Sequence, residues 1–293
     1  MIQRPFGSTG LIVSALGFGA GHIGNPGMPE EQVARILHSA LDAGISLFDT
    51  ARGYGMSEER IGRHLKSRRD EFVLSTKVGY GIPGFEDWTG PIIGAGVRAA
   101  LQRLETDRID IVHLHSCPLD VLKRGDVIEA LNREVEAGRV LVAAYSGEND
   151  ALEAAALDSR FRSIQCSINI CDQWSLSNVI PHAAKRRLGV IGKRPAANVP
   201  WRFPSRPTGQ YAEVYWDRWT AMQLDARGLD WTELALRFAA YQPGVSSCIM
   251  GTGNLEHLQH AVDAVNKGAL SYDHEQAIRE AFARNGASWR GEV

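Results

Sequence analysis

The feature that most constrains the fold is a regular alternation of two kinds of segment along the chain. Short apolar runs of strand length are separated by longer segments whose apolar residues recur with helical spacing. Eight of these runs are predicted strands: Val13–Gly17, Ile45–Asp49, Phe72–Lys77, Ile109–His115, Val140–Ser146, Ile164–Ser167, Val190–Lys193 and Cys248–Gly251. Their ends recur on average about every 33 residues, which matches the length of one strand and the helix that follows it.

Eight amphipathic segments lie between or after these runs and are predicted helices. They are Glu30–Ala43, Glu58–Leu65, Pro91–Leu104, Val121–Ala137, Leu152–Leu157, Asn178–Arg187, Thr232–Tyr241 and Leu255–Val265. Eight strand–helix units in 293 residues predict an α/β fold, a (β/α)8 TIM barrel that forms a single domain over residues 1–293. The last interval, residues 194–230, is too long for an ordinary connection and is expected to be a lid or binding loop.

An open, doubly wound parallel sheet is the competing architecture for alternating strands and helices. Such a sheet binds dinucleotides at a G-x-G-x-x-G turn that opens a helix. The early glycines of this chain, Gly17, Gly19, Gly21 and Gly24, do not fit that spacing. The barrel is therefore the favoured fold.

Composition excludes several classes of function. Lys and Arg number 32 and Asp and Glu 34, so the net charge of −2 argues against nucleic acid as the main partner. No apolar run approaches the roughly 18 residues of a membrane span, so we expect no membrane partner. The four cysteines show no C-x-x-C pairing and no zinc-like spacing, which predicts free thiols, no metal and a cytoplasmic protein.

Polar, ionisable residues end three consecutive predicted strands. Asp49, Lys77 and His115 stand where the second, third and fourth strands finish. Catalytic groups of barrels lie at the carboxyl ends of strands, and neighbouring strands are only about 4.8 Å apart, so these three side chains are expected to cluster. Because a buried Lys beside an Asp is costly and packing needs neither, the cluster indicates function. His113 shares the His115 face and is interpreted as barrel filling, and Cys117 as a packing residue.

A tyrosine follows the second strand closely. Tyr54 lies on a glycine-flanked loop that can fold over the same end of the barrel. A phenol is a weak acid near neutral pH, but a nearby ammonium stabilises its anion. Lys77 can supply that ammonium and Asp49 can hold it, while His115 offers a second donor to an oxygen. The set suits a carbonyl that becomes an alkoxide.

Several segments of the chain resemble the aldo-keto reductase family. They are G-S-T-G-L-I-V-S-A-L-G-F-G at 7–19, F-D-T-A-R-G-Y-G-M-S-E-E-R-I-G-R-H-L-K at 48–66, L-S-T-K at 74–77, D-R-I-D-I-V-H-L-H at 107–115, E-L-A-L-R-F-A at 233–239 and Q-P-G-V-S-S-C-I-M-G at 242–251. The resemblance implies a barrel that reduces a small-molecule carbonyl with a nicotinamide cofactor bound extended across its mouth. The family's catalytic tetrad falls on Asp49, Tyr54, Lys77 and His115.

The resemblance also implies which residues hold the cofactor. Ser146 and Gln165 would meet the nicotinamide carboxamide, although Gly147 stands where the family usually has Asn. Lys193 and Arg194 would meet the pyrophosphate, a surface role being the alternative. The other expected contacts are Gly19, Gly251, Thr252, Gly253, Asn254 and His257. In NADPH-preferring family members, arginines near the start of the last helix usually bind the 2′-phosphate, and this chain has none of them there. Thr252, Gly253 and Asn254 offer only neutral donors, so we expect NADP(H) to be accepted with modest preference over NAD(H).

Two tryptophans, Trp88 and Trp201, are expected to wall the substrate pocket, with loop pinning as the alternative. Two other functions are alternatives to carbonyl reduction. A cofactor-binding regulatory or redox-sensing subunit with slow turnover is the main alternative, although the intact tetrad disfavours it. A metal-dependent barrel hydrolase ranks last, because converging His and carboxylate ligands are missing from the strand ends.

Overall fold

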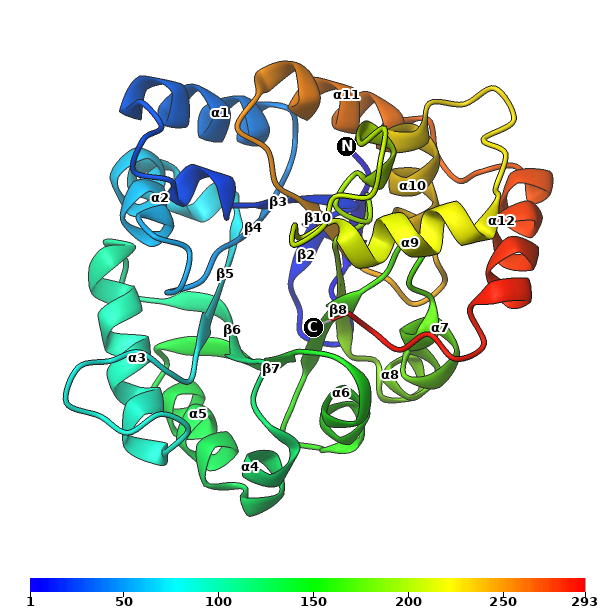
Figure 1. The fold of residues 1–293 in the computed structure, drawn as a ribbon. Helices are drawn as coiled ribbons and strands as arrows, with labels where there is room; N and C mark the ends of the chain where they lie inside the picture. Colours follow the sequence, from blue (N-terminus) through cyan, green and yellow to red (C-terminus); the bar gives the residue numbers. More distant parts are fainter. Residues whose placement is uncertain (293) are drawn as a thin grey trace.

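Eight parallel strands close into a barrel around which the helices are arranged (Figure 1). This computed structural model describes residues 1–292. The barrel order is β10-β3-β4-β5-β6-β7-β8-β9. Its strands are β3 (Leu16–Gly19), β4 (Leu47–Asp49), β5 (Val73–Val78), β6 (Ile109–His115), β7 (Val140–Ser146), β8 (Ser163–Ser167), β9 (Gly189–Lys193) and β10 (Ser247–Met250). The predicted TIM barrel is thereby confirmed.

An antiparallel hairpin, β1 (Gln3–Pro5) and β2 (Ile12–Ser14), precedes the barrel. The hairpin residues Phe6 and Val13 are fully buried, and they form one apolar cluster with residues of the barrel strands such as Leu47 and Ile111. The predicted first strand, Val13–Gly17, is therefore wrong, because it joins the end of β2 to the start of β3. The apolar run is buried throughout, so hydrophobicity alone does not mark the change from hairpin to barrel.

Twelve helices surround the barrel in the described chain. They are α1 (Glu30–Asp42), α2 (Ser57–Leu65), α3 (Gly90–Arg103), α4 (Leu119–Arg124), α5 (Asp126–Glu136), α6 (Asn149–Leu157), α7 (Trp174–Asn178), α8 (Ile180–Arg186), α9 (Glu213–Met222), α10 (Trp231–Ala240), α11 (Leu255–Asn266) and α12 (Tyr272–Asn285). The predicted helix Val121–Ala137 is two helices, because Gly125 between α4 and α5 has φ 84°, a conformation that ends a helix.

Two segments outside the repeating units cover part of the barrel's carboxyl end. The first is the long connection after β9, which the sequence predicts to be a lid or binding loop and which carries α9. The second is the chain after α12, which runs back beside β8 (Figure 1). There Gly291 exchanges hydrogen bonds with Asn149, and the backbone N–H of Glu292 donates to Asp172.

The four cysteines, Cys117, Cys166, Cys171 and Cys248, are free and buried. Within residues 1–292, no helix is both long enough and apolar enough to cross a membrane.

Candidate active site

A buried ion pair lies at the carboxyl ends of β4 and β5. Lys77 Nζ is 2.5 Å from Asp49 Oδ2 and donates to the Thr50 carbonyl at 2.8 Å. Both charged side chains are at most 2% exposed. Burial alone would raise the pKa of Asp49, but the Lys77 ammonium holds it below its usual value. Burial likewise opposes the charge of Lys77, but Asp49 and the Tyr54 phenol raise its pKa. The pair is therefore charged on both sides.

Asp49 is also the acceptor at the centre of a hydrogen-bonded layer inside the barrel. Its Oδ1 accepts from Ser75 Oγ at 2.7 Å and from Gln165 Nε2 at 3.0 Å. Gln165 Oε1 in turn accepts from Ser146 Oγ at 2.8 Å. These bonds leave Asp49 few ways to rotate, so the position of Lys77 is fixed as well.

His113 belongs to this layer and fills the barrel, as its place on the strand predicted. It is fully buried, and its Nε2 lies 3.1 Å from Ser75 Oγ. Burial lowers the pKa of His113 to about 4, so the ring is neutral at physiological pH. Because Ser75 gives its proton to Asp49, the His113 Nε2 carries the proton of this contact.

Tyr54 is held over the ion pair by a tightly packed loop. Lys77 Nζ lies 4.9 Å from the centroid of the Tyr54 ring. Gly24 allows this approach, since a Cβ there would lie 1.7 Å from the Tyr54 carbonyl oxygen. On the same loop Thr50 Oγ1 donates to Ser57 Oγ at 2.7 Å, which ties the loop to the start of α2. The phenol and the ammonium are therefore neighbours, as the sequence predicted.

His115 completes the tetrad at the end of β6. Its ring meets the Tyr54 ring edge to face, with centroids 6.0 Å apart. Burial, together with the charges of Lys77 and Lys193, lowers the pKa of His115 to about 3. The imidazole is neutral at physiological pH and can donate from only one nitrogen. Its Nδ1 is 2.7 Å from the hydroxyl of Tyr80, a residue that sequence reasoning missed.

The tetrad lies at one end of a cavity of about 1080 Å³. Asp49, Tyr54 and His115 line it, whereas Lys77 lies behind them. All ten residues expected to hold a cofactor line the same cavity: Gly19, Ser146, Gln165, Lys193, Arg194, Gly251, Thr252, Gly253, Asn254 and His257. The structure therefore brings together, around one cavity, residues that are far apart in the sequence.

The two tryptophans that were expected to wall the substrate pocket, Trp88 and Trp201, pack against other aromatic side chains instead. Trp201 is absent from the cavity wall and stacks on Trp231 with ring centroids 5.9 Å apart. Trp88 covers Gly79 and packs against Tyr80, with ring centroids 5.8 Å apart. Both make the loop-pinning contacts that the sequence left as the alternative.

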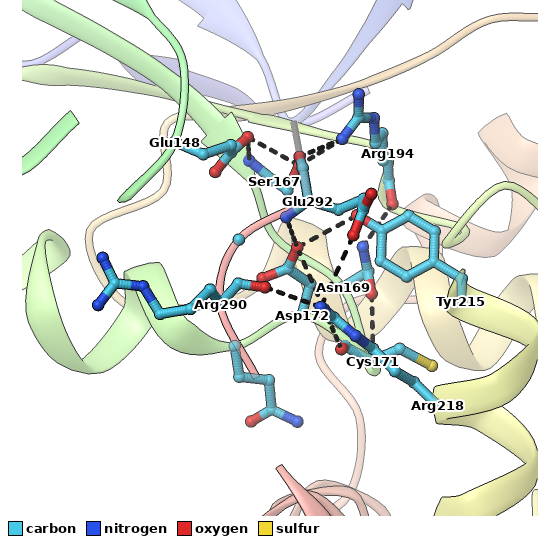
Figure 2. Close-up of polar contacts among 12 residues, drawn as sticks. Glu148, Ser167, Asn169, Cys171, Asp172, Arg194, Tyr215, Arg218, Arg290 and Glu292 are labelled. Carbon is cyan, nitrogen blue, oxygen red and sulfur yellow. Dashed lines mark hydrogen bonds and ion pairs between the residues drawn. The ribbon is translucent and has the colours of Figure 1, made fainter. Parts of the chain in front are cut away.

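Lys193 and Arg194 are cavity residues with protein partners of their own. Lys193 Nζ lies 3.1 Å from Glu148 Oε1, and Glu148 Oε1 also accepts from the Ser167 hydroxyl. Arg194 donates to Ser167 and to the Glu292 carbonyl, and Figure 2 shows its guanidinium directed at both. The cations are therefore held in fixed places at the cavity wall.

Glu148 was missed in the sequence because it stands in no recognisable motif, two residues after Ser146. Arg202 was also missed. It is exposed on the long connection after β9, lines the cavity and has no salt-bridge partner in the described chain. Its only sequence signal is its position in the segment expected to form a lid.

The cavity residues fit a dinucleotide. The cavity volume of about 1080 Å³ is at the upper end of ligand sites, and three cations that could meet phosphates, Lys193, Arg194 and Arg202, line it. At the cavity wall the backbone after β10 approaches β3 so closely that residue 251 has to be glycine. A Cβ on Gly251 would lie 2.6 Å from the carbonyl oxygen of Gly19. Within residues 1–292, no group of three or more His, Cys, Asp or Glu side chains is placed to hold a metal.

A closed parallel barrel with this site defines an oxidoreductase that acts on carbonyls. The chain matches the Aldo/keto reductase family over residues 15–282 and belongs to that family. It is 26% identical to L-galactose dehydrogenase of Arabidopsis thaliana over 93% of this chain and 91% of the relative. It is 29% identical to D-threo-aldose 1-dehydrogenase of a Pseudomonas species over 83% and 87%. Among solved structures, the holo form of an aldo-keto reductase from Bacillus halodurans matches with a TM-score of 0.84, at 27% identity over 96% of both chains.

Proposed function

We propose that this protein reduces an aldehyde or ketone to an alcohol with NAD(P)H, and that Tyr54 donates the proton. The observation that carries the proposal is the placement of Tyr54 and His115 at the cavity wall over the buried Lys77–Asp49 pair. When bound, the nicotinamide would supply the hydride. The same groups serve the reverse oxidation, in which Tyr54 receives the proton.

The chain's own residues act on the carbonyl oxygen. Tyr54 gives this oxygen its proton, and the positive charge of Lys77 stabilises the phenolate that remains. Asp49 keeps Lys77 charged and fixed. His115, neutral and at the cavity wall, donates a hydrogen bond to the same oxygen as negative charge develops there.

The far end of the cavity is proposed to hold the adenosine part of the cofactor. Thr252 and Gly253 lie there at the start of α11, where an anion is stabilised by the helix terminus. Asn254 Oδ1 accepts from the backbone N–H groups of Glu256 and His257, so this side chain is a helix cap. Its amide N–H group can still donate to a 2′-phosphate, but a neutral donor holds a phosphate more weakly than an arginine does, which supports a modest preference for NADPH.

The relatives' names point to polyhydroxylated substrates, so we propose a sugar-like aldehyde or its cyclic hemiacetal. The test is a screen in which NADPH or NADH oxidation is followed with simple aldehydes, ketones and open-chain aldoses. The oxidation direction is tested with NADP+ or NAD+ and two kinds of substrate: alditols, which reverse the reduction of an aldose, and cyclic aldoses, whose hemiacetal C1 hydroxyl is oxidised to a lactone carbonyl. Turnover in either direction supports the proposal. Tight cofactor binding without turnover on any substrate would favour the regulatory-subunit alternative instead.

A further inference from the structure

Tyr80 touches the tetrad from outside the cavity. Its hydroxyl lies 2.7 Å from His115 Nδ1, and the two rings stack with centroids 5.5 Å apart at 28°. Tyr80 is absent from the cavity wall, whereas His115 lines it. The hydrogen bond that joins Tyr80 to the tetrad is made with His115, so an effect of this bond on a substrate in the cavity passes through the His115 ring.

The position of the Tyr80 ring is fixed by packing on two sides. Trp88 lies against it with ring centroids 5.8 Å apart. On the other side Gly53 leaves room for the hydroxyl, since a Cβ on Gly53 would lie 3.3 Å from it. The hydroxyl is thus held at His115 Nδ1 by several contacts and does not depend on this one hydrogen bond for its place.

The proton in this contact has two possible positions. In one arrangement Tyr80 donates to Nδ1, and the ring proton of the neutral imidazole is on Nε2. In the other, Nδ1–H donates to Tyr80, and Nε2 presents a lone pair. Within residues 1–292 the Tyr80 hydroxyl has no other hydrogen-bond partner, so the second arrangement leaves its proton without a protein acceptor.

A carbonyl oxygen accepts hydrogen bonds, so only an imidazole that carries its proton on Nε2 can donate to it from the cavity side. We propose that Tyr80 is a positioning residue that fixes His115 as the Nε2–H tautomer, so that Nε2 donates to the substrate oxygen. This inference rests on the proposed function for the substrate, but the tautomer itself is a property of the free protein. Burial raises the pKa of Tyr80, which keeps its hydroxyl protonated and able to donate.

The kinetic test is Tyr80→Phe, which keeps the ring and removes the hydroxyl. We expect kcat/KM for a carbonyl substrate to fall about tenfold, mostly in kcat, because the donor to the developing alkoxide is no longer fixed. The matched control is Tyr241→Phe, which removes a hydroxyl bonded to the Val265 carbonyl at 2.7 Å, outside the cavity. Its kcat/KM should stay within twofold of the wild type.

A double variant separates positioning from a direct or purely structural role. Asn in place of His115 offers an amide donor that has no tautomers. In the His115→Asn background, Tyr80→Phe should therefore change kcat/KM by less than about twofold. A loss equal to that in the wild-type background would overturn the proposal.

The tautomer is read directly by 15N NMR of the imidazole nitrogens, with the His115 signals assigned from their loss in His115→Asn. In the wild type we expect a protonated Nε2 and an unprotonated Nδ1, and in Tyr80→Phe a shift toward a mixture. A wild-type Nδ1–H tautomer would overturn the inference whatever the kinetics show. Because this measurement needs no substrate, it stands even if the screen finds no turnover and even if Tyr80→Phe does not fold.

Discussion

The side chains of Lys77 and Asp49 form a buried ion pair directly behind the wall of the cavity, which Asp49 also lines. The Nζ–Oδ2 distance is 2.5 Å and neither side chain is more than 2% exposed. Lys77 is also 4.9 Å from the Tyr54 ring centroid, so one charge serves both the barrel interior and the phenol. The pair supplies the positive charge beside the Tyr54 phenol, and it is also costly to bury. Substitutions in the pair should therefore change catalytic activity and the free energy of unfolding in ways that can be measured separately.

Lys77→Met should lower both turnover and stability. Turnover falls because the phenolate of Tyr54 loses its counter-charge, and the free energy of unfolding falls by about 3–5 kcal/mol because Asp49 stays buried without a cation. Urea unfolding and steady-state kinetics measure the two effects. In the double variant Lys77→Met/Asp49→Asn, part of the stability should return while turnover stays lost. A double variant no more stable than the single one contradicts this explanation.

Tyr54→Phe keeps the ring and removes the proton that the carbonyl oxygen is proposed to receive. We expect kcat to fall by roughly 10²–10⁴. Cofactor affinity, measured by fluorescence titration, should change little, because the hydroxyl lies at the catalytic end of the cavity. Near-normal turnover would remove Tyr54 from the role of proton donor.

The barrel could be predicted from the regular spacing of strands and helices, and most of the tetrad from residues that stand at the ends of neighbouring strands. The strand–helix spacing determines the barrel, and parallel strands bring Asp49, Lys77 and His115 to one end whatever the loops do. Tyr54 was predicted to join them from its glycine-flanked loop directly after the second strand, and the family resemblance then implied the same four residues. Element boundaries such as the break between β2 and β3 were missed because burial is continuous across them.

The roles of single side chains were less predictable, because they depend on contacts between distant segments. Tyr80 follows Lys77 by three residues, but only the fold places its hydroxyl at His115. Trp201 stands on the expected lid, but it packs on Trp231 of α10. Asn254 lines the cavity as expected, and its Oδ1 also caps α11. For Tyr80 and Trp201 a tertiary contact decides the role of the side chain, whereas the Asn254 cap is a local contact.

The cap changes which substitution should strengthen NADPH selectivity. Asn254→Arg would remove the cap at a cost of about 1 kcal/mol. His257 is exposed, lines the cavity and has no such role for its side chain. We expect His257→Arg to raise the ratio of kcat/KM for NADPH to that for NADH by about tenfold or more, through a charge-assisted bond to the 2′-phosphate. The control Gln259→Arg adds the same charge to α11 outside the cavity and should leave the ratio unchanged. Equal ratios in both variants would place the phosphate elsewhere.

Asp172 should make stability depend on pH near neutrality. Its side chain is 1% exposed, and its Oδ2 accepts from Tyr215 and from the Glu292 backbone (Figure 2). Burial, together with the charge of Glu148, raises the pKa of Asp172 to about 7 from an ordinary value of 3.8. Between these values the folded protein keeps a proton that the unfolded chain has released, so stability is lost as pH rises from 4 to 7.

Asp172→Asn keeps an oxygen acceptor for these contacts and removes the titration. The free energy of unfolding of the wild type relative to this variant should therefore fall as pH rises from 4 to 8, by up to roughly 4 kcal/mol at about 1.4 kcal/mol for each pKa unit. Urea unfolding at several pH values measures it. Asp217→Asn is the matched control, because Arg206 lowers the pKa of Asp217 and its carboxylate is ionised in both states over most of this range. Wild-type and Asp172→Asn stabilities that run parallel with pH would show that Asp172 is already ionised in the folded protein.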